Sequence, residues 1–285
     1  MEPKEYECQE ENMWCPGCGN FGLKNALIKA LAELDIKPKD LALIGGIGQS
    51  PKFTHYIKGN ALDGLHGRAF TMAVGTKLTN PKLKVIAFDG DGGAYAEGMN
   101  HFMQNIRRNV ELVYFVNNNQ VFGLTKGQAS PTADNDMITK STPHGIIFPR
   151  FNPVAVSLVN GGTFIARIYT GNVEYSKEII KKALNHKGTA FIDVLQPCVS
   201  FAKNKSYQYY KDRVYTLESI NHDPSNHAAA LEKAFEWGEK IPIGLFYKAE
   251  RGTFRDQYPG LKDNLELYKY VPPREKIQKF IEEFK

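Results

Sequence analysis

Short apolar runs alternate with longer amphipathic segments along most of the chain. The runs that predict buried strands lie at 41–47, 84–88, 111–116, 163–169 and 189–195. The segments with apolar residues at helical spacing lie at 21–34, 69–78, 94–107 and 175–184. Strands that alternate with helices of this length predict an α/β fold with a doubly wound parallel sheet. In such sheets ligands bind at the carboxyl ends of the strands.

The chain changes character after about Phe201. Residues 206–215 are rich in Tyr and Lys, and helices are predicted at 227–237 and 274–284. We found no internal repeat and no low-complexity tract. Residues 1–200 are therefore expected to form an α/β domain, and residues 201–285 a C-terminal extension, an arm or cap packed on it rather than an independent domain.

Composition indicates an ordinary globular protein. A chain of 285 residues that is 42% hydrophobic can bury a full core. The net charge of +5 is small and scattered, so nucleic acid is not an expected partner. The N-terminus is polar and acidic, and no stretch approaches the roughly 18 apolar residues of a membrane span. We expect no membrane association and a cytoplasmic location.

The predicted strand at 84–88 runs directly into a glycine-rich turn, Asp89-Gly90-Asp91-Gly92-Gly93, and a helix is predicted to follow. Glycines there let backbone N–H groups face a ligand anion. Asp91 would repel a bare phosphate, so the turn is explained if a divalent cation lies between carboxylate and diphosphate. A purely structural β-to-α turn is the alternative. A nicotinamide site is disfavoured, because neither GDGGAY nor GIGQSP completes the Gly-x-Gly-x-x-Gly fingerprint.

The next predicted strand ends in asparagines, which would place amide oxygens at the same edge of the sheet if the two strands are neighbours. A Gly-Asp-Gly turn followed by Asn after an apolar strand resembles the signature of thiamine-diphosphate enzymes. By that resemblance, Asp91, Asn119 and the carbonyl of Val121 are expected to bind Mg²⁺. Gly90 and Gly92 are expected to border the cofactor diphosphate.

Further segments make the resemblance more specific. They are WCPGCGNFG at 14–22, GGIGQS at 45–50, HGRA at 66–69, GLTKGQASPT at 123–132 and LQPC at 195–198. In this order, over roughly residues 12 to 260, the chain resembles the β subunit of the 2-oxoacid:ferredoxin oxidoreductases. The implied fold is a sheet of the thiamine-diphosphate-binding type.

The resemblance also implies roles for individual residues. Gly48, Leu124 and Thr125 are expected beside the cofactor. His66 is expected near it as a catalytic residue, and Lys126 is expected to face the substrate. A structural histidine and a solvated loop lysine are the alternatives for these two. Lys52 is a weaker candidate for contact with substrate or coenzyme A.

Members of this family bind a [4Fe–4S] cluster, and Cys15, Cys18 and Cys198 match three of its ligands. Gln49 stands where the family pattern has the fourth cysteine, and an amide is a poor ligand for the iron of such clusters. Three outcomes stay open: Cys8 or a non-cysteine group fills the position, a three-iron or labile cluster forms, or the cluster is absent. A zinc knuckle and a buried structural turn are further alternatives for the CPGC segment.

The function implied is that of a thiamine-diphosphate-binding β subunit. It would decarboxylate a 2-oxoacid oxidatively with coenzyme A, giving acyl-CoA and CO₂, and pass electrons through the cluster to ferredoxin. Thiamine enzymes also need a Glu at the pyrimidine ring, which the resemblance assigns to a partner α subunit. Two other readings stay open: a non-oxidative thiamine-dependent decarboxylase or synthase subunit, and a cysteine-metal binding module. The sequence does not indicate which 2-oxoacid is used.

Overall fold

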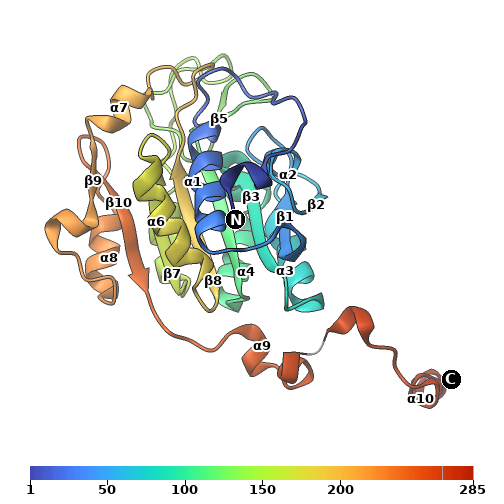
Figure 1. Ribbon diagram of the computed structural model, residues 1–285. Helices are drawn as coiled ribbons and strands as arrows, with labels where there is room; N and C mark the ends of the chain where they lie inside the picture. Colours follow the sequence, from blue (N-terminus) through green and yellow to red (C-terminus); the bar gives the residue numbers. More distant parts are fainter. Residues whose placement is uncertain (265, 285) are drawn as a thin grey trace.

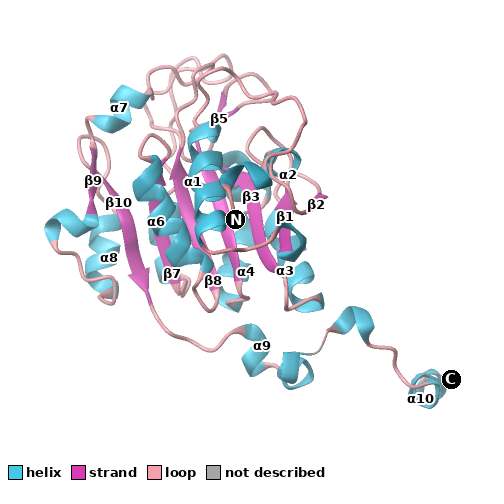
Figure 2. Ribbon diagram, viewed as in Figure 1, coloured by secondary structure: helices cyan, strands magenta, loops and turns pink. Residues whose placement is uncertain are grey.

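The computed structural model describes residues 1–264 and 266–284 and contains an eight-stranded sheet with the order β2-β1-β3-β4-β8-β7-β10-β9 (Figures 1 and 2). The strands are β1 (Leu41–Gly45), β2 (Asn60–Asp63), β3 (Lys84–Gly90), β4 (Leu112–Asn118), β7 (Phe164–Tyr169), β8 (Thr189–Leu195), β9 (Val214–Thr216) and β10 (Ile241–Lys248). Neighbouring strands are parallel except for β10, which runs antiparallel to β7. The predicted α/β fold with a mainly parallel sheet is confirmed.

Helices cover both faces of this sheet (Figure 1). One face carries α1 (Asn20–Glu33) and α6 (Val173–Leu184), which pack against each other. The other face carries α3 (Ala69–Thr79), α4 (Met99–Arg108), α5 (Pro153–Val159) and α8 (His227–Ala234). Because both faces are covered, every residue of β4 is buried, which explains its unbroken apolar run.

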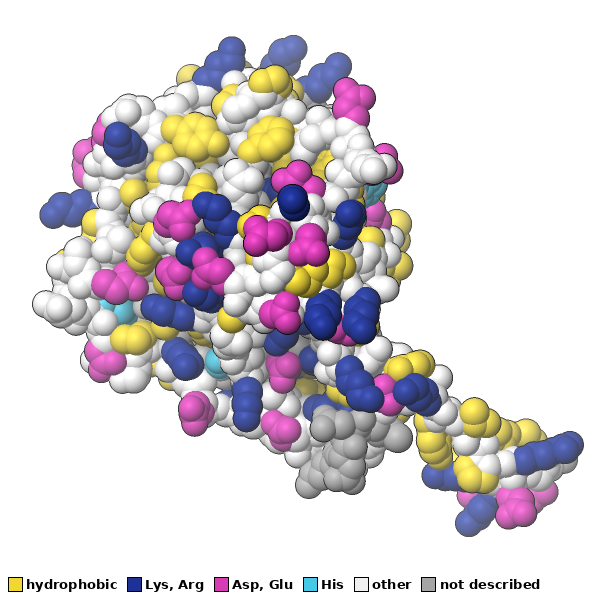
Figure 3. Space-filling model, viewed as in Figure 1, with side chains coloured by type: hydrophobic (Ala, Val, Ile, Leu, Met, Phe, Trp, Pro, Cys, Tyr) yellow, Lys and Arg dark blue, Asp and Glu magenta, His cyan; other side chains and the backbone are white. Residues whose placement is uncertain are grey.

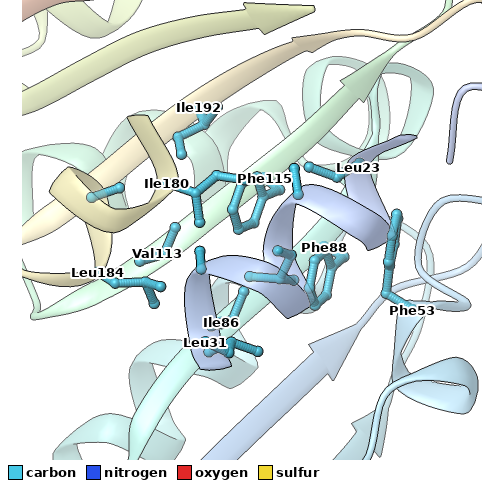
Figure 4. Packing of buried hydrophobic residues seen from close by; sticks show 14 of the residues in the cluster. Leu23, Leu31, Phe53, Ile86, Phe88, Val113, Phe115, Ile180, Leu184 and Ile192 are labelled. Carbon is cyan, nitrogen blue, oxygen red and sulfur yellow. The ribbon is translucent and has the colours of Figure 1, made fainter. Parts of the chain in front are cut away.

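The core on the α1 and α6 side shows how the sequence pattern becomes packing (Figure 4). Phe88 of β3 stacks on Phe115 of β4 with ring centroids 5.6 Å apart. Leu31 of α1 and Ile180 of α6 belong to the same buried cluster. The strands that lead to the candidate site are therefore anchored by a closely packed hydrophobic core.

Strands β2, β9 and β10 were not predicted from the sequence. All four residues of β2 are exposed at the sheet edge, so the sequence contains no apolar run that would indicate this strand. In β10, Pro242 and Gly244 interrupt the apolar pattern, and the pairing register with β7 shifts between Leu245 and Tyr247. Two strands from beyond residue 201 thus enter the sheet. The division into 1–200 and 201–285 stays a prediction.

After β10 the chain leads away from the sheet through α9 (Phe254–Gln257) to α10 (Arg274–Glu283) (Figure 1). Hydrophobic side chains are exposed along this arm (Figure 3), including Phe280 at 54% and Val271 at 85%. Within the described ranges, no helix combines the length and apolar character needed to cross a membrane.

Candidate functional site

A cavity of about 340 Å³ opens at the carboxyl ends of the central strands, within the size range of small-molecule sites. This is the end of the sheet where the loops gather at the top of Figure 1. Gly90 at the tip of β3 pairs with Asn117 near the tip of β4, so the two strand ends lie side by side. The residues predicted to bind cofactor all line this cavity: Gly48, His66, Gly90, Asp91, Gly92, Asn119, Val121, Leu124 and Thr125.

Asp91 is buried, with 1% of its surface exposed, and its two carboxylate oxygens differ in their surroundings. Oδ2 accepts hydrogen bonds from the backbone N–H of Gln120 at 2.8 Å and from the hydroxyls of Ser130 at 2.6 Å and Thr132 at 2.7 Å. Among the residues that the structure describes, Oδ1 accepts only from the N–H of Gly92, at 3.1 Å. Burial raises the pKa of Asp91 to about 6. A cation beside Oδ1 would stabilise the ionised form that burial disfavours.

The loop after β4 turns back toward Asp91 at Gln120. This residue has φ +66°, in the left-handed region that few non-glycine residues adopt, and it is fully buried. Its neighbours Asn119 and Val121 both line the cavity. The Asn119 side chain accepts from the N–H of Val121 at 3.1 Å and donates to Gln196 at 2.9 Å. The structure therefore brings the three predicted Mg²⁺ ligands to one cavity.

Within the glycine turn, Gly92 has no space for a side chain. A Cβ at Gly92 would lie 2.3 Å from the ring of Phe122, which comes from the short strand β5 (Val121–Phe122). The helix predicted at 94–107 is divided into a π-helix, η3 (Gly93–Glu97), and α4. Such π-helical turns occur often at functional sites. Here the division places the end of η3, Glu97, on the cavity wall.

The cysteine segments meet in a second, smaller cavity of about 70 Å³, lined by Cys15, Cys18, Cys198 and Gln49. Each of the three sulfurs accepts a hydrogen bond from residues 196–201. Burial raises the pKa of Cys18 to about 11. Cys8 is not among the residues that line this cavity.

Gln49 connects the two cavities, because it lines both. Its side-chain oxygen Oε1 is buried and has no hydrogen-bond partner within the described residues. Its backbone carbonyl accepts from the indole Nε1 of Trp14 at 2.7 Å. Trp14 itself is buried between Phe53 and Tyr56, so the cysteine segment is fastened to the loop that carries Gln49.

Comparison with known proteins identifies the family. Residues 46–194 match the model of the thiamine pyrophosphate enzyme C-terminal TPP-binding domain. Residues 198–263 match the C-terminal part of the pyruvate ferredoxin oxidoreductase beta subunit. Curated β subunits of 2-oxoacid:ferredoxin oxidoreductases match most of the chain at 45% and 47% identity. The chain belongs to the 2-oxoacid:ferredoxin oxidoreductase β subunits. The β subunit therefore binds thiamine diphosphate, and the resemblance seen in its sequence is confirmed.

Relatives match over most of the β subunit. It is 45% identical over 252 residues to subunit beta of 2-oxoacid:ferredoxin oxidoreductase 1 of Aeropyrum pernix, covering 85% of this chain and 79% of that one. It is 47% identical over 253 residues to the corresponding subunit of Saccharolobus solfataricus, with coverages of 85% and 83%.

A solved structure is also similar over the whole length of the β subunit. It is the 2-oxoglutarate:ferredoxin oxidoreductase of Magnetococcus marinus, with 2-oxoglutarate, coenzyme A and succinyl-CoA bound. The TM-score is 0.91 at 34% sequence identity, covering 100% of the β subunit and 96% of that chain. This agreement confirms the fold class.

Two lysines predicted to contact substrate are not among the residues lining either cavity. Lys126 is exposed at the turn between β5 and β6 (Gln128–Ala129), with φ +75°. It directly follows Thr125, which does line the larger cavity. Lys52 lies at the start of α2 (Phe53–Tyr56) and is partly exposed. Their contacts with substrate stay predictions.

Sequence reasoning missed a buried polar chain behind Asp91. Thr132 contacts both Asp91 and the Asn118 side chain, whose Nδ2 donates to Asp193 at 3.1 Å. Asp193 in turn accepts from Nε of Arg167 at 2.8 Å, and both partners are fully buried. The only sequence signal was a charged residue in the middle of each of two apolar strands. This series of polar contacts connects Asp91 at the cavity to a charged pair buried within the sheet.

Proposed function

We propose that the β subunit, with its partner, oxidatively decarboxylates a 2-oxoacid. The 2-oxoacid and coenzyme A would give acyl-CoA, CO₂ and a proton, and two electrons would pass to ferredoxin. The observation that carries the proposal is the asymmetry of Asp91. One oxygen is saturated by protein donors and the other is left for a cation, beside a cavity that adjoins three cysteines.

Mg²⁺ would be held by Asp91, Asn119 and the carbonyl of Val121. These are hard oxygen donors of the kind that Mg²⁺ binds together with phosphate oxygens. Thiamine diphosphate, when bound, supplies the electron sink for the loss of CO₂. Gly90 and Gly92 would let the diphosphate approach the backbone.

The other cavity residues would orient the cofactor and the substrate. Gly48, Leu124 and Thr125 would pack beside the cofactor, and His66 would serve proton transfer near the reacting atoms. Lys126, at the turn between β5 and β6, would attract the substrate carboxylate. An exposed lysine can do this through its charge before substrate enters, because such steering acts over several ångströms.

Cys15, Cys18 and Cys198 would bind an iron–sulfur cluster. Their cavity shares Gln49, Asn119 and Gly123 with the larger one, so electrons released at the substrate would have a short path to the cluster. The fourth cluster position would lack a thiolate, because Gln49 occupies it.

A partner α subunit would cover the cavity mouth and supply the Glu for the pyrimidine ring. Two apolar residues that line the cavity are exposed, Ile47 at 47% and Leu124 at 51%. Exposed apolar groups at a cavity rim are typical of a protein interface. We therefore expect the isolated β subunit to be inactive.

A second candidate, a non-oxidative thiamine-dependent decarboxylase or synthase subunit, is favoured by one observation, the amide of Gln49 in place of a cysteine. The visible spectrum of the anaerobically purified complex separates the two, since a broad sulfur-to-iron band is expected only for the oxidoreductase. A colourless complex that decarboxylates a 2-oxoacid without reducing ferredoxin would favour the second candidate.

The variant Asp91→Asn tests the site. It keeps the shape of the side chain and removes the charge that would bind Mg²⁺. We expect Mg²⁺-dependent affinity for thiamine diphosphate, measured by calorimetry in the αβ complex, to fall on the order of a hundredfold. Asp40→Asn is the control, because Asp40 is exposed and does not line the cavity. Unchanged affinity in Asp91→Asn would remove Asp91 from the cofactor site.

A further inference from the structure

A carboxylate and an imidazole face each other on the wall of the larger cavity. Nδ1 of His66 lies 2.9 Å from Oε2 of Glu97, and the two side chains are 34% and 47% exposed. His66 precedes α3, whereas Glu97 ends η3, so the pair joins two separate turns. Both residues line the cavity.

The backbone fixes the two turns against each other. Gly67 has φ +69°, and a Cβ there would lie 2.5 Å from the backbone nitrogen of Gly98. Arg68 donates to the carbonyl of Glu97 at 2.8 Å and to that of His66 at 3.3 Å. The residues on either side of the pair are therefore clamped together, and the pair is a built feature of the cavity rather than a chance surface contact.

This geometry determines what the imidazole offers to a ligand. The Glu97 carboxylate lies at ion-pair distance from Nδ1, so its charge favours the tautomer with the proton on that nitrogen. Nε2, for which the described residues provide no hydrogen-bond partner, could then accept a proton when the ring is neutral or donate one when it is charged. The His66 ring lies 6.3 Å from the ring of Phe122, the residue that covers Gly92. The imidazole is thus beside the turn expected to hold the cofactor diphosphate.

We propose that Glu97 is a positioning residue that holds His66 in the tautomer with Nε2 free for a 2-oxoacid in the cavity. The proposal rests on the proposed function, because it assigns a role within the same site. Glu97 belongs to none of the sequence motifs that pointed to that function. Its place depends on the π-helical turn that ends at Glu97.

The chain offers a matched control for this pair. His55 and Asp63 form a similar contact, with Nε2 2.6 Å from Oδ2 and exposures of 52% and 39%. Neither residue lines the cavity. An exposed ion pair by itself contributes little to stability, so Asp63→Asn reports the effect of breaking such a pair away from the site.

The experiment compares Glu97→Ala, Glu97→Asp and His66→Ala, with the double variant of Glu97→Ala and His66→Ala, in the αβ complex. We expect Glu97→Ala to lower kcat about tenfold, as loss of a residue that orients a catalytic group typically does. KM for the 2-oxoacid and affinity for thiamine diphosphate should change less than about twofold, because Glu97 acts through His66. Glu97→Asp should restore part of the loss, and Glu97→Ala should have no further effect when His66 is Ala.

Two results would overturn the proposal. One is a multiplicative loss in the double variant, which would show that Glu97 acts independently of His66. The other is a decrease in Asp63→Asn as large as that in Glu97→Ala, which would indicate a general effect of breaking such pairs. If the wild-type complex oxidises no 2-oxoacid at all, it is the proposed function that fails, so the two failures are distinguishable.

Discussion

The buried ion pair behind the site makes a prediction about the stability of the β subunit. Arg167 and Asp193 lie in the neighbouring strands β7 and β8 and are both fully buried. Arg167→Met keeps an unbranched side chain of similar length and removes the charge. Asp193 would then keep one donor in the described structure, the amide of Asn118 at 3.1 Å.

The expected cost follows from this loss. Removing one partner of a buried pair leaves an uncompensated charge, which costs about 3–5 kcal/mol in free energy of unfolding. That is a large share of a typical total of about 5–15 kcal/mol. The contact of Arg167 with the Trp237 and Phe246 rings, each 5.3 Å away, would be replaced in part by sulfur–aromatic contact. Replacing both partners, with Arg167→Met and Asp193→Leu together, should restore most of the stability.

Urea unfolding followed by tryptophan fluorescence is the assay, since Trp237 lies beside Arg167. Lys29→Met, which breaks an exposed ion pair with Glu174, is the control and should leave the unfolding midpoint close to wild type. A loss below about 1 kcal/mol for Arg167→Met would refute the reasoning. So would a double variant as unstable as the single one.

Two further predictions concern pH and the cluster. Burial lowers the pKa of His186 to about 4 from 6.5, so as pH falls through this range the unfolded chain gains a proton that the folded chain does not. Unfolding free energy should therefore be about 2 kcal/mol lower at pH 5 than above pH 7 from this group alone, and His186→Gln should remove that part of the pH dependence. Gln49→Cys should give a cluster more resistant to mild oxidation, measured as less three-iron signal by electron paramagnetic resonance. Equal signals in Gln49→Cys and the wild type would contradict a missing fourth ligand.

Much of the site could be predicted because it depends on local patterns. Asp91 and Asn119 each follow an apolar run, and the carboxyl ends of parallel strands meet at one edge. Ser130 and Thr132 could not be predicted as donors to Asp91, since the irregular loop that returns them to the carboxylate has no period. Glu97 was missed because its direction depends on a π-helical turn rather than on regular helical spacing.

The fold, too, could be predicted from the sequence only in part. Fully buried strands such as β4 have unbroken apolar sequences, whereas the edge strand β2 is exposed along its length. The sequence did not predict β10 because Pro242 and Gly244 interrupt its apolar pattern. A central strand is specified by its own residues, but an edge strand is specified by the neighbour with which it pairs, and this information is distributed over the chain.

The packing of Trp14 has a consequence for assembly of the enzyme. Domains held together only by metal unfold when the ion is removed. Here the indole ring, buried against Phe53 and Tyr56, holds the segment bearing Cys15 and Cys18 in place through side-chain packing. Under the proposed function, this segment would therefore stay in place when a cluster is lost to oxidation, and the cluster could be replaced without refolding of the polypeptide.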